Sequence, residues 1–122
     1  MSSTSYRILR YAMAVLFLWF GVQQVMRPVD WQAFLPDWIF TMPVSPIVFV
    51  RANGVFEIVF GGALALGLYT RVAAAVLAFH LGIIAVSVGS NIGARDAALT
   101  AAVAAIAFTR PDSWTLDRFL KR

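Results

Sequence analysis

The chain has 122 residues, of which 61% are hydrophobic and 13% are charged, whereas a soluble domain has about 45–50% and about 25%. This composition excludes an ordinary soluble domain and predicts a single all-α integral membrane domain over residues 1–122. The absence of cysteine excludes disulfides, thiolate catalysis and cysteine-bound metals or clusters. The net charge is +4. Because the basic residues lie between apolar runs, we expect the lipid bilayer, and not nucleic acid, as the partner.

The first predicted membrane-spanning helix covers residues 8–26, after a frayed cytoplasmic tail at residues 1–6. Two arginines before the apolar stretch are typical of a signal peptide, but no small-x-small cleavage site follows, so we expect the helix to be retained. Arg27 and Pro28 end the helix, because proline and the residue before it disfavour continued helix.

Residues 28–46 differ from the rest of the chain, because four prolines interrupt them. Their apolar residues recur at the spacing of one helix face, and they are Trp31, Phe34, Leu35, Trp38 and Ile39. Pro36 is expected to divide this face into two short pieces. Tryptophans beside aspartates suit the lipid headgroup region. Two roles stay open, an anchoring belt or a lid over a cavity between the helices.

Three more spans are predicted over residues 47–69, 72–88 and 95–109, which completes a four-helix bundle. The connections at 70–71 and 89–94 are so short that consecutive helices must be antiparallel neighbours. The tail after the fourth span is short, amphipathic and basic, which predicts a segment at the membrane interface.

The orientation of the bundle follows from the lysines and arginines in its short loops. Seven lie on one side of the predicted spans, namely Arg7, Arg10, Arg71, Arg110, Arg118, Lys121 and Arg122. Three lie on the other side, namely Arg27, Arg51 and Arg95. The larger number marks the cytoplasmic side, so we expect a multi-pass protein with both termini in the cytoplasm.

Glu57 is the focus of the sequence, because it interrupts an apolar run from residue 53 to residue 70. A charge at the centre of a bilayer costs roughly 3 kcal/mol on insertion scales, so this group needs a partner or a task. Glu57 is expected about 18 Å and His80 about 13 Å from the inner ends of their helices. Other polar side chains collect in the outer half, which predicts a cavity there. The candidate ligand-binding or proton-handling residues are Glu57, His80, Arg95, Asp96, Gln24 and Arg51.

Each candidate also has a structural interpretation. Glu57 is either one half of an ion pair with Arg51 or Arg95, or a proton acceptor or ligand contact. His80 either donates a hydrogen bond to a backbone carbonyl or to Glu57, or it couples protonation to redox chemistry or transport. Asp96 is either an N-cap of the fourth span or part of the cavity.

No self-contained catalytic, metal or redox centre is visible in the sequence. A single histidine and scattered carboxylates lack the spacing of a metal site, and one histidine gives haem one axial ligand. We therefore expect no catalytic residue, no metal and no intrinsic cofactor. Gln24 either forms an interhelical hydrogen bond or contacts a ligand.

Four stretches of the chain carry a resemblance to known proteins, namely RILRYAMAVLFLWFGVQQVMRP, GVFEIVFGGALALGLYTRVAAAVLAFHLGI, IGARDAAL and the closing DSWTLD. They cover about residues 7–118, and the most specific parts are Gly54–Glu57 and the GLYTR turn. In these stretches the chain resembles the DoxX-like family of small four-span bacterial membrane proteins. Many members carry a lysine where this chain has Gln24.

The resemblance implies a location in the bacterial inner membrane and a four-helix bundle. The family takes its name from a subunit associated with a terminal quinol oxidase, and relatives are linked to thiosulfate:quinone oxidoreduction. It therefore implies a non-catalytic subunit or accessory protein of a redox or respiratory complex that contacts a quinone or a lipid. Two other functions stay open. One is a small transporter or channel component with Glu57 and His80 as a proton-coupled site, and the other is a structural module that packs against a larger complex or forms a homo-oligomer.

Overall fold

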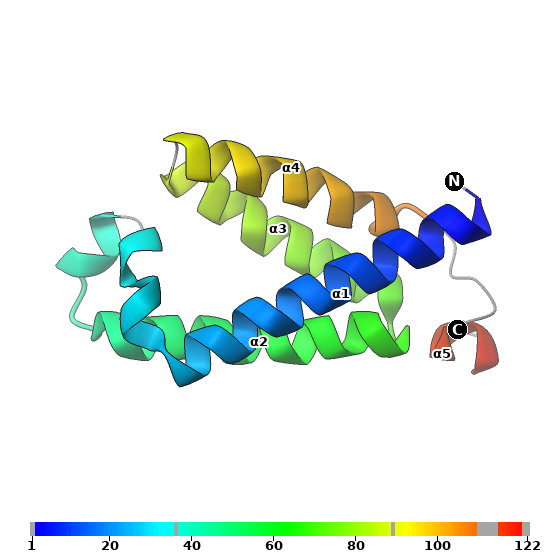
Figure 1. Cartoon of the computed structure of the whole chain (residues 1–122), viewed down its shortest axis with the longest axis horizontal. Coiled ribbons are helices and arrows are strands. Elements are labelled where there is room, and N and C mark those ends of the chain that lie inside the picture. The colour runs from blue at the N-terminus through cyan, green and yellow to red at the C-terminus, as the bar shows by residue number, and fades with distance from the viewer. Residues whose placement is uncertain (1, 36, 89, 110–114, 121–122) are drawn as a thin grey trace.

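The structure is a computed structural model of the chain and describes residues 2–35, 37–88, 90–109 and 115–120 (Figure 1). Its elements in chain order are α1 (Ser3–Met26), η1 (Pro28–Phe34), η2 (Asp37–Thr41), α2 (Pro46–Leu66), α3 (Thr70–Val88), α4 (Ser90–Ala107) and α5 (Leu116–Phe119). The elements η1 and η2 are 3-10 helices, and the described residues contain no strand. The prediction of an all-α chain with four long helices is therefore confirmed for this part of the chain.

The four long helices form two pairs, α1 with α2 and α3 with α4 (Figure 1). The pairs converge at the end that holds the N-terminus of α1 and the turn between α2 and α3, at the right of Figure 1. We call this end the base. At the opposite end the pairs diverge toward η1 and η2, which form the lid (residues 28–34 and 37–41). The buried apolar core lies mostly toward the base and includes Tyr6, Phe17, Leu64, Leu77 and Ile106.

The first helix is longer than the sequence predicts, because it begins five residues before the predicted span. The hydroxyl of Ser2 accepts a hydrogen bond from the backbone N–H of Ser5 at 3.1 Å and caps this end. The prediction of a frayed tail over residues 1–6 is therefore wrong for the described residues. The other end is as predicted, since α1 stops at Met26, two residues before Pro28.

Later boundaries also differ from the prediction. The helix α3 begins at Thr70, so the predicted connection at residues 70–71 is wrong, because these residues belong to the helix. The helix α2 ends at Leu66 because Gly67 adopts the left-handed conformation with φ 70°, which stops the helix. The helix α4 begins at Ser90, so the prediction of a loop over residues 89–94 is wrong, apart from residue 89, which lies outside the described residues. The 18 residues of α4 extend over about 27 Å, close to the roughly 30 Å of a bilayer core.

The lid consists of two short pieces on either side of residue 36, as the prolines predict, and residue 36 itself lies outside the described residues. Trp31 of η1 meets Phe20 of α1 edge to face, with ring centroids 5.4 Å apart. Trp38 of η2 meets Phe49 of α2 in the same way at 6.4 Å. Such pairs contribute about 0.5–1.5 kcal/mol beyond their buried area. This packing favours a lid on the helices over a detached anchoring belt.

Two arginines stabilise the base by donating hydrogen bonds to carbonyl groups at helix C-termini. Arg10 is buried and Arg71 is exposed. Arg10 of α1 is 0% exposed, and one of its guanidinium nitrogens donates to the carbonyls of Leu64 and Ala65, both at 2.8 Å. Arg71 donates to the carbonyl of Ala107 at 2.8 Å. The last carbonyls of a helix lack partners within the helix and carry partial negative charge. Both arginines therefore stabilise the end of a neighbouring helix.

The C-terminal segment caps the turn between α2 and α3. The two carboxylate oxygens of Asp117 accept hydrogen bonds at 2.6 Å, one from the backbone N–H of Tyr69 and one from that of Thr70. These donors open α3, where the helix dipole favours a negative charge. Thr115 packs so closely on Gly67 that a Cβ at this glycine would lie 2.5 Å from the threonine Cβ. The described part of the predicted interfacial tail thus docks on the base, and the rest lies outside the described residues.

Many large apolar side chains are exposed on the long helices, while several polar groups are inside. Among the described residues, α1 and α2 are long and apolar enough to cross a membrane, and α3 has a shorter apolar stretch over Thr70–Val86. Phe79 and Phe108 are exposed, whereas Arg10 and Glu57 are buried. This distribution is the reverse of that in soluble proteins and suits helices that face lipid.

The crossing of α1 and α2 depends on two glycines. A Cβ at Gly54 would lie 2.7 Å from the carbonyl oxygen of Gly21 and 2.9 Å from the Cβ of Gln24. We expect Gly54→Ala to lower the free energy of unfolding by about 2 kcal/mol, because the backbones must separate. The measurement is thermal unfolding in detergent followed by circular dichroism. Gly62→Ala is the control, since nothing lies within 4 Å of its Cβ position, and equal melting temperatures for the two variants would contradict this account.

Candidate functional site

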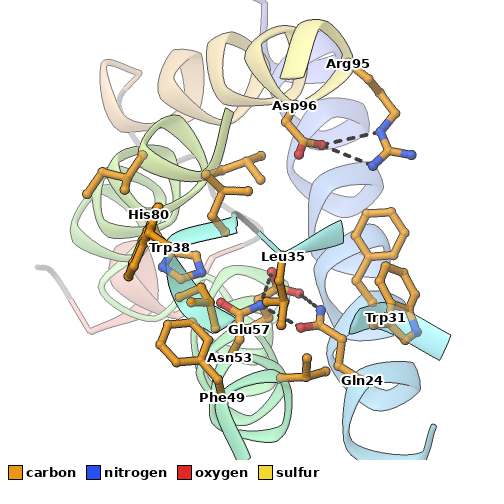
Figure 2. Close-up of a pocket in the computed structure, with 16 residues that line it drawn as sticks. Gln24, Trp31, Leu35, Trp38, Phe49, Asn53, Glu57, His80, Arg95 and Asp96 are labelled. Carbon is orange, nitrogen blue, oxygen red and sulfur yellow. Dashed lines mark hydrogen bonds and ion pairs between the residues drawn. The ribbon is translucent and has the colours of Figure 1, made fainter. Parts of the chain in front are cut away.

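A cavity of about 230 Å³ lies between the two helix pairs, next to the lid (Figure 2). All four long helices and the lid contribute to its wall. Most of the wall is apolar, and its aromatic residues are Phe20, Trp31, Trp38 and Phe49. Its polar residues are Gln24, Asn53, Glu57, His80, Arg95 and Asp96. The cavity is therefore a mainly apolar space with a few polar groups that face it from different helices.

Glu57 lies at the centre of a hydrogen-bonded group that joins α1 and α2. One of its carboxylate oxygens accepts from the side-chain amide of Gln24 at 2.9 Å, and the other accepts from that of Asn53 at 3.3 Å. The amide of Asn53 also donates to the amide oxygen of Gln24 at 2.7 Å. Glu57 is 4% exposed. The network holds the carboxylate in place and leaves further lone pairs on its oxygens, since a carboxylate has about four acceptor positions.

The local sequence explains how these three side chains meet. Asn53 and Glu57 are four residues apart on α2, so they lie on the same helix face. Gln24 comes from α1, and it reaches them because Gly54 lets the two backbones approach. A lysine at the position of Gln24 would place a cation beside Glu57.

The structure does not contain the predicted ion pair of Glu57. Arg51 is exposed and does not line the cavity. Arg95 lines the cavity, but its guanidinium faces Asp96, with a nitrogen–oxygen distance of 3.4 Å. Among the described residues, Glu57 therefore has neutral amide partners and no cationic one. The ion-pair interpretation is wrong for the described residues, because Arg51 is exposed away from the cavity wall and Arg95 pairs with Asp96.

His80 lies on the α3 side of the cavity (Figure 2). Its ring packs against that of Phe56 of α2, with centroids 4.4 Å apart and the ring planes tilted by 38°. Its Nε2 is buried and has no hydrogen-bond partner among the described residues, so the predicted bond to a carbonyl or to Glu57 is not found at this atom. A buried polar atom without a partner is destabilising by about 1–3 kcal/mol. A ligand in the cavity that exchanges a hydrogen bond with Nε2 would remove this cost.

Asp96 is the seventh residue of α4, so the prediction that it caps this helix is wrong. An N-cap at Asp96 fits the sequence because the apolar run of the fourth span begins after it, whereas the helix itself starts in the preceding polar residues. Asp96 is buried and lines the cavity next to Arg95, whose side chain is 52% exposed. These two residues form the charged part of the rim on α4 (Figure 2).

The structure places five of the six predicted site residues around one cavity, and Arg51 is the exception. The predicted set lacks Asn53, although its spacing of four residues from Glu57 indicates a shared face. It also lacks Phe20 and Phe49, because nothing in an apolar helix distinguishes a cavity wall from a packed core. The residues Trp31 and Trp38 of the lid line the cavity.

The family model described as DoxX matches residues 6–90. This range holds most of α1 and all of the lid, α2 and α3, and it includes Gln24, Asn53, Glu57 and His80. Searches of the curated proteins and of the solved structures gave no match.

Proposed function

Because this chain belongs to the DoxX family of small membrane proteins, we propose that it crosses the bacterial inner membrane four times, with the base and both termini on the cytoplasmic side. The exposed apolar surface of the helices supports this arrangement. The positive-inside rule supports the orientation, since Arg7, Arg10 and Arg71 lie at the base and the sequence after residue 109 adds four more basic residues. In this arrangement the cavity lies in the outer half of the bilayer.

The function that the site supports best is binding of the ring of a quinol or quinone, as a membrane subunit or accessory protein of a redox complex. One observation carries this proposal, namely an aromatic-walled cavity in which the Glu57 carboxylate and the Nε2 of His80 both have capacity for another hydrogen bond. Small-molecule sites are mainly apolar with a few placed polar groups. A quinol ring offers apolar faces and two hydroxyl groups, which match such a site.

The chemistry that these residues can perform is proton handling. A quinol loses two electrons and two protons when it is oxidised to the quinone. Glu57 and His80 are the groups in the cavity that would bind its hydroxyls and take up their protons. The electrons would pass to a partner oxidoreductase. Native mass spectrometry of the gently extracted protein tests whether such a partner or a quinone is bound. A larger oxidoreductase assembly or a bound quinone supports the proposal, and a monomer or homo-oligomer with phospholipid alone opposes it.

Tryptophan fluorescence tests the binding site directly. Quinones quench nearby tryptophans, and Trp31 and Trp38 line the cavity whereas the exposed Trp19 does not. We expect a short-chain quinone to quench the protein saturably and the saturable part to fall by more than half in the Trp31→Phe, Trp38→Phe variant. It should remain in Trp19→Phe. Quenching that depends equally on Trp19 would mean that the quinone only dissolves in the detergent around the helices.

A second function, proton-coupled transport of a small cation, is favoured by one separate observation. Glu57 is a buried carboxylate without a cationic partner among the described residues, and a cation in the cavity would supply one. Flux of such a cation into liposomes that depends on a proton gradient and is lost in Glu57→Gln would support transport. Saturable quinone binding without flux would support the first proposal.

A further inference from the structure

Two apolar side chains belong both to the cavity wall and to the outer surface. Ile83 of α3 and Trp38 of the lid line the cavity, yet they are 49% and 48% exposed. A side chain that contacts the cavity and is also half-exposed marks the rim of an opening. Phe49 of α2 completes this rim, since it lines the cavity and contacts Trp38. We call the gap bounded by Trp38, Phe49 and Ile83 the side opening.

The side opening lies between α2 and α3, which meet at the base and diverge toward the lid (Figure 1). Ile83 is 13 residues beyond Thr70, the first residue of α3, which places it about 20 Å from the base. The hydrocarbon core of a bilayer is roughly 30 Å thick. In the proposed four-span arrangement the opening therefore faces the acyl chains of the outer leaflet and not water.

The size of the cavity limits what fits inside it. Sites that enclose a whole small-molecule ligand measure about 300–1,000 Å³, and this cavity measures about 230 Å³. A ring fits such a space, but a long tail does not. Any tail must leave through the rim, and the apolar side opening favours this more than the charged rim formed by Arg95 and Asp96.

We propose that the apolar tail of the bound molecule passes through the side opening into the bilayer. The ligand is then a lipid with a ring and a tail, and it enters the cavity from the outer leaflet. This inference rests on the proposed binding of a ring in the cavity and adds the chemical class of the whole ligand. The ring occupies the cavity with Glu57 and His80, and the tail passes between Phe49 and Ile83 into the bilayer. Ligands with a tail should then bind more tightly than the same ring alone.

The absence of native cysteine allows a direct test. Ile83→Cys places a single thiol at the side opening, and Val72→Cys places one on the same helix at an exposed position outside the cavity. Each purified, folded variant is labelled with a bulky maleimide, and the binding of decylubiquinone and of its tail-less ring is measured by tryptophan quenching. Labelled Ile83→Cys should bind decylubiquinone about tenfold more weakly and the tail-less ring within twofold of the unlabelled protein. Labelled Val72→Cys should bind both as before.

Two outcomes would overturn the side opening while leaving ring binding intact. One is unchanged decylubiquinone binding after Ile83→Cys is labelled, and the other is an equal loss with both labelled variants. Failure of both compounds to bind the unlabelled protein would instead count against ring binding. A second measurement covers that case, namely quenching of Trp38, kept as the one tryptophan, by phospholipids with brominated acyl chains. If labelling of Ile83→Cys lowers the quenching and labelling of Val72→Cys does not, acyl chains reach Trp38 through the side opening. Equal quenching in the two labelled variants overturns the proposal.

Discussion

Replacing Arg10 with methionine is expected to lower the free energy of unfolding by about 3 kcal/mol, because it removes two hydrogen bonds that a buried, charged side chain donates. The guanidinium of Arg10 is 0% exposed and donates to the carbonyls of Leu64 and Ala65 in the last turn of α2. Methionine has a similar length and fills much of the space, so the loss reports the hydrogen bonds more than a cavity. Unfolding in detergent, followed by circular dichroism, measures the difference.

Two matched variants make this result specific. Arg51→Met removes an exposed arginine from α2 and should leave the free energy of unfolding within about 0.5 kcal/mol of the original. Arg10→Lys keeps a positive charge but not the planar group with several donors, so it should lie between the original and the methionine variant. If Arg10→Met is as stable as Arg51→Met, the contacts of Arg10 with α2 do not stabilise the base.

The stability of the base bears on the cavity at the other end. The buried apolar core lies mostly toward the base, where Arg10 and Asp117 also fasten helix ends. Toward the lid the helix pairs diverge (Figure 1), and the cavity takes the place of core packing. A ligand site between diverging helices can exist because the helices are held together elsewhere. Replacement of Arg10 should therefore reduce ligand binding only by the fraction of the protein that it unfolds. The folded fraction should keep its affinity.

The sequence predicts the features that depend on neighbouring residues within one segment of the chain. Apolar runs indicate the long helices, Pro28 marks the end of α1, and the prolines around residue 36 divide the lid. The start of α4 at Ser90 is missed because its first turns are polar and hydropathy does not distinguish them from a loop. Local signals thus identify the elements but misplace an end that lacks an apolar residue.

Helix geometry could have corrected part of the predicted site. Arg51 is six residues from Glu57, which is about 240° around the helix, whereas Asn53 is four residues away, or about 40°. The same count that excludes Arg51 indicates Asn53 as the neighbour of Glu57. The burial of Arg10, predicted as a cytoplasmic charge, could not be found in this way. It depends on which helix end lies beside α1, and a single sequence does not contain that information.

Glu57→Gln is expected to separate the proposed function from the stability of the fold. A buried carboxylate with neutral amide partners is costly to keep, so its replacement by an amide of the same shape should leave the free energy of unfolding unchanged or raise it by about 1 kcal/mol. The new amide can still accept from Gln24 with its oxygen. Its nitrogen faces the amide nitrogen of Asn53, so Asn53 must turn its oxygen toward it. That turn ends the hydrogen bond from Asn53 to the oxygen of Gln24, which offsets part of the gain from removing the charge.

The effect of Glu57→Gln on binding depends on the oxidation state of the ligand. A quinol hydroxyl donates to a carboxylate, and such a charge-assisted bond is about twice as strong as a neutral one. A quinone carbonyl can only accept, so it gains from the new amide N–H. We therefore expect quinol affinity to fall about tenfold, which corresponds to about 1.4 kcal/mol, while quinone affinity stays the same or increases. Tryptophan quenching with the reduced and oxidised forms of one compound measures both.

Asp37→Asn is the matched control, because Asp37 is an exposed carboxylate of the lid that does not line the cavity. It should leave both affinities unchanged. A Glu57→Gln variant that binds quinol and quinone as the original does would remove Glu57 from the site. A large loss of stability in the same variant would mean that the carboxylate holds α1 and α2 together as a structural group. Unchanged stability together with weaker quinol binding and unweakened quinone binding is the result expected of a proton-accepting Glu57, since its carboxylate, unlike the amide that replaces it, can take a hydroxyl proton.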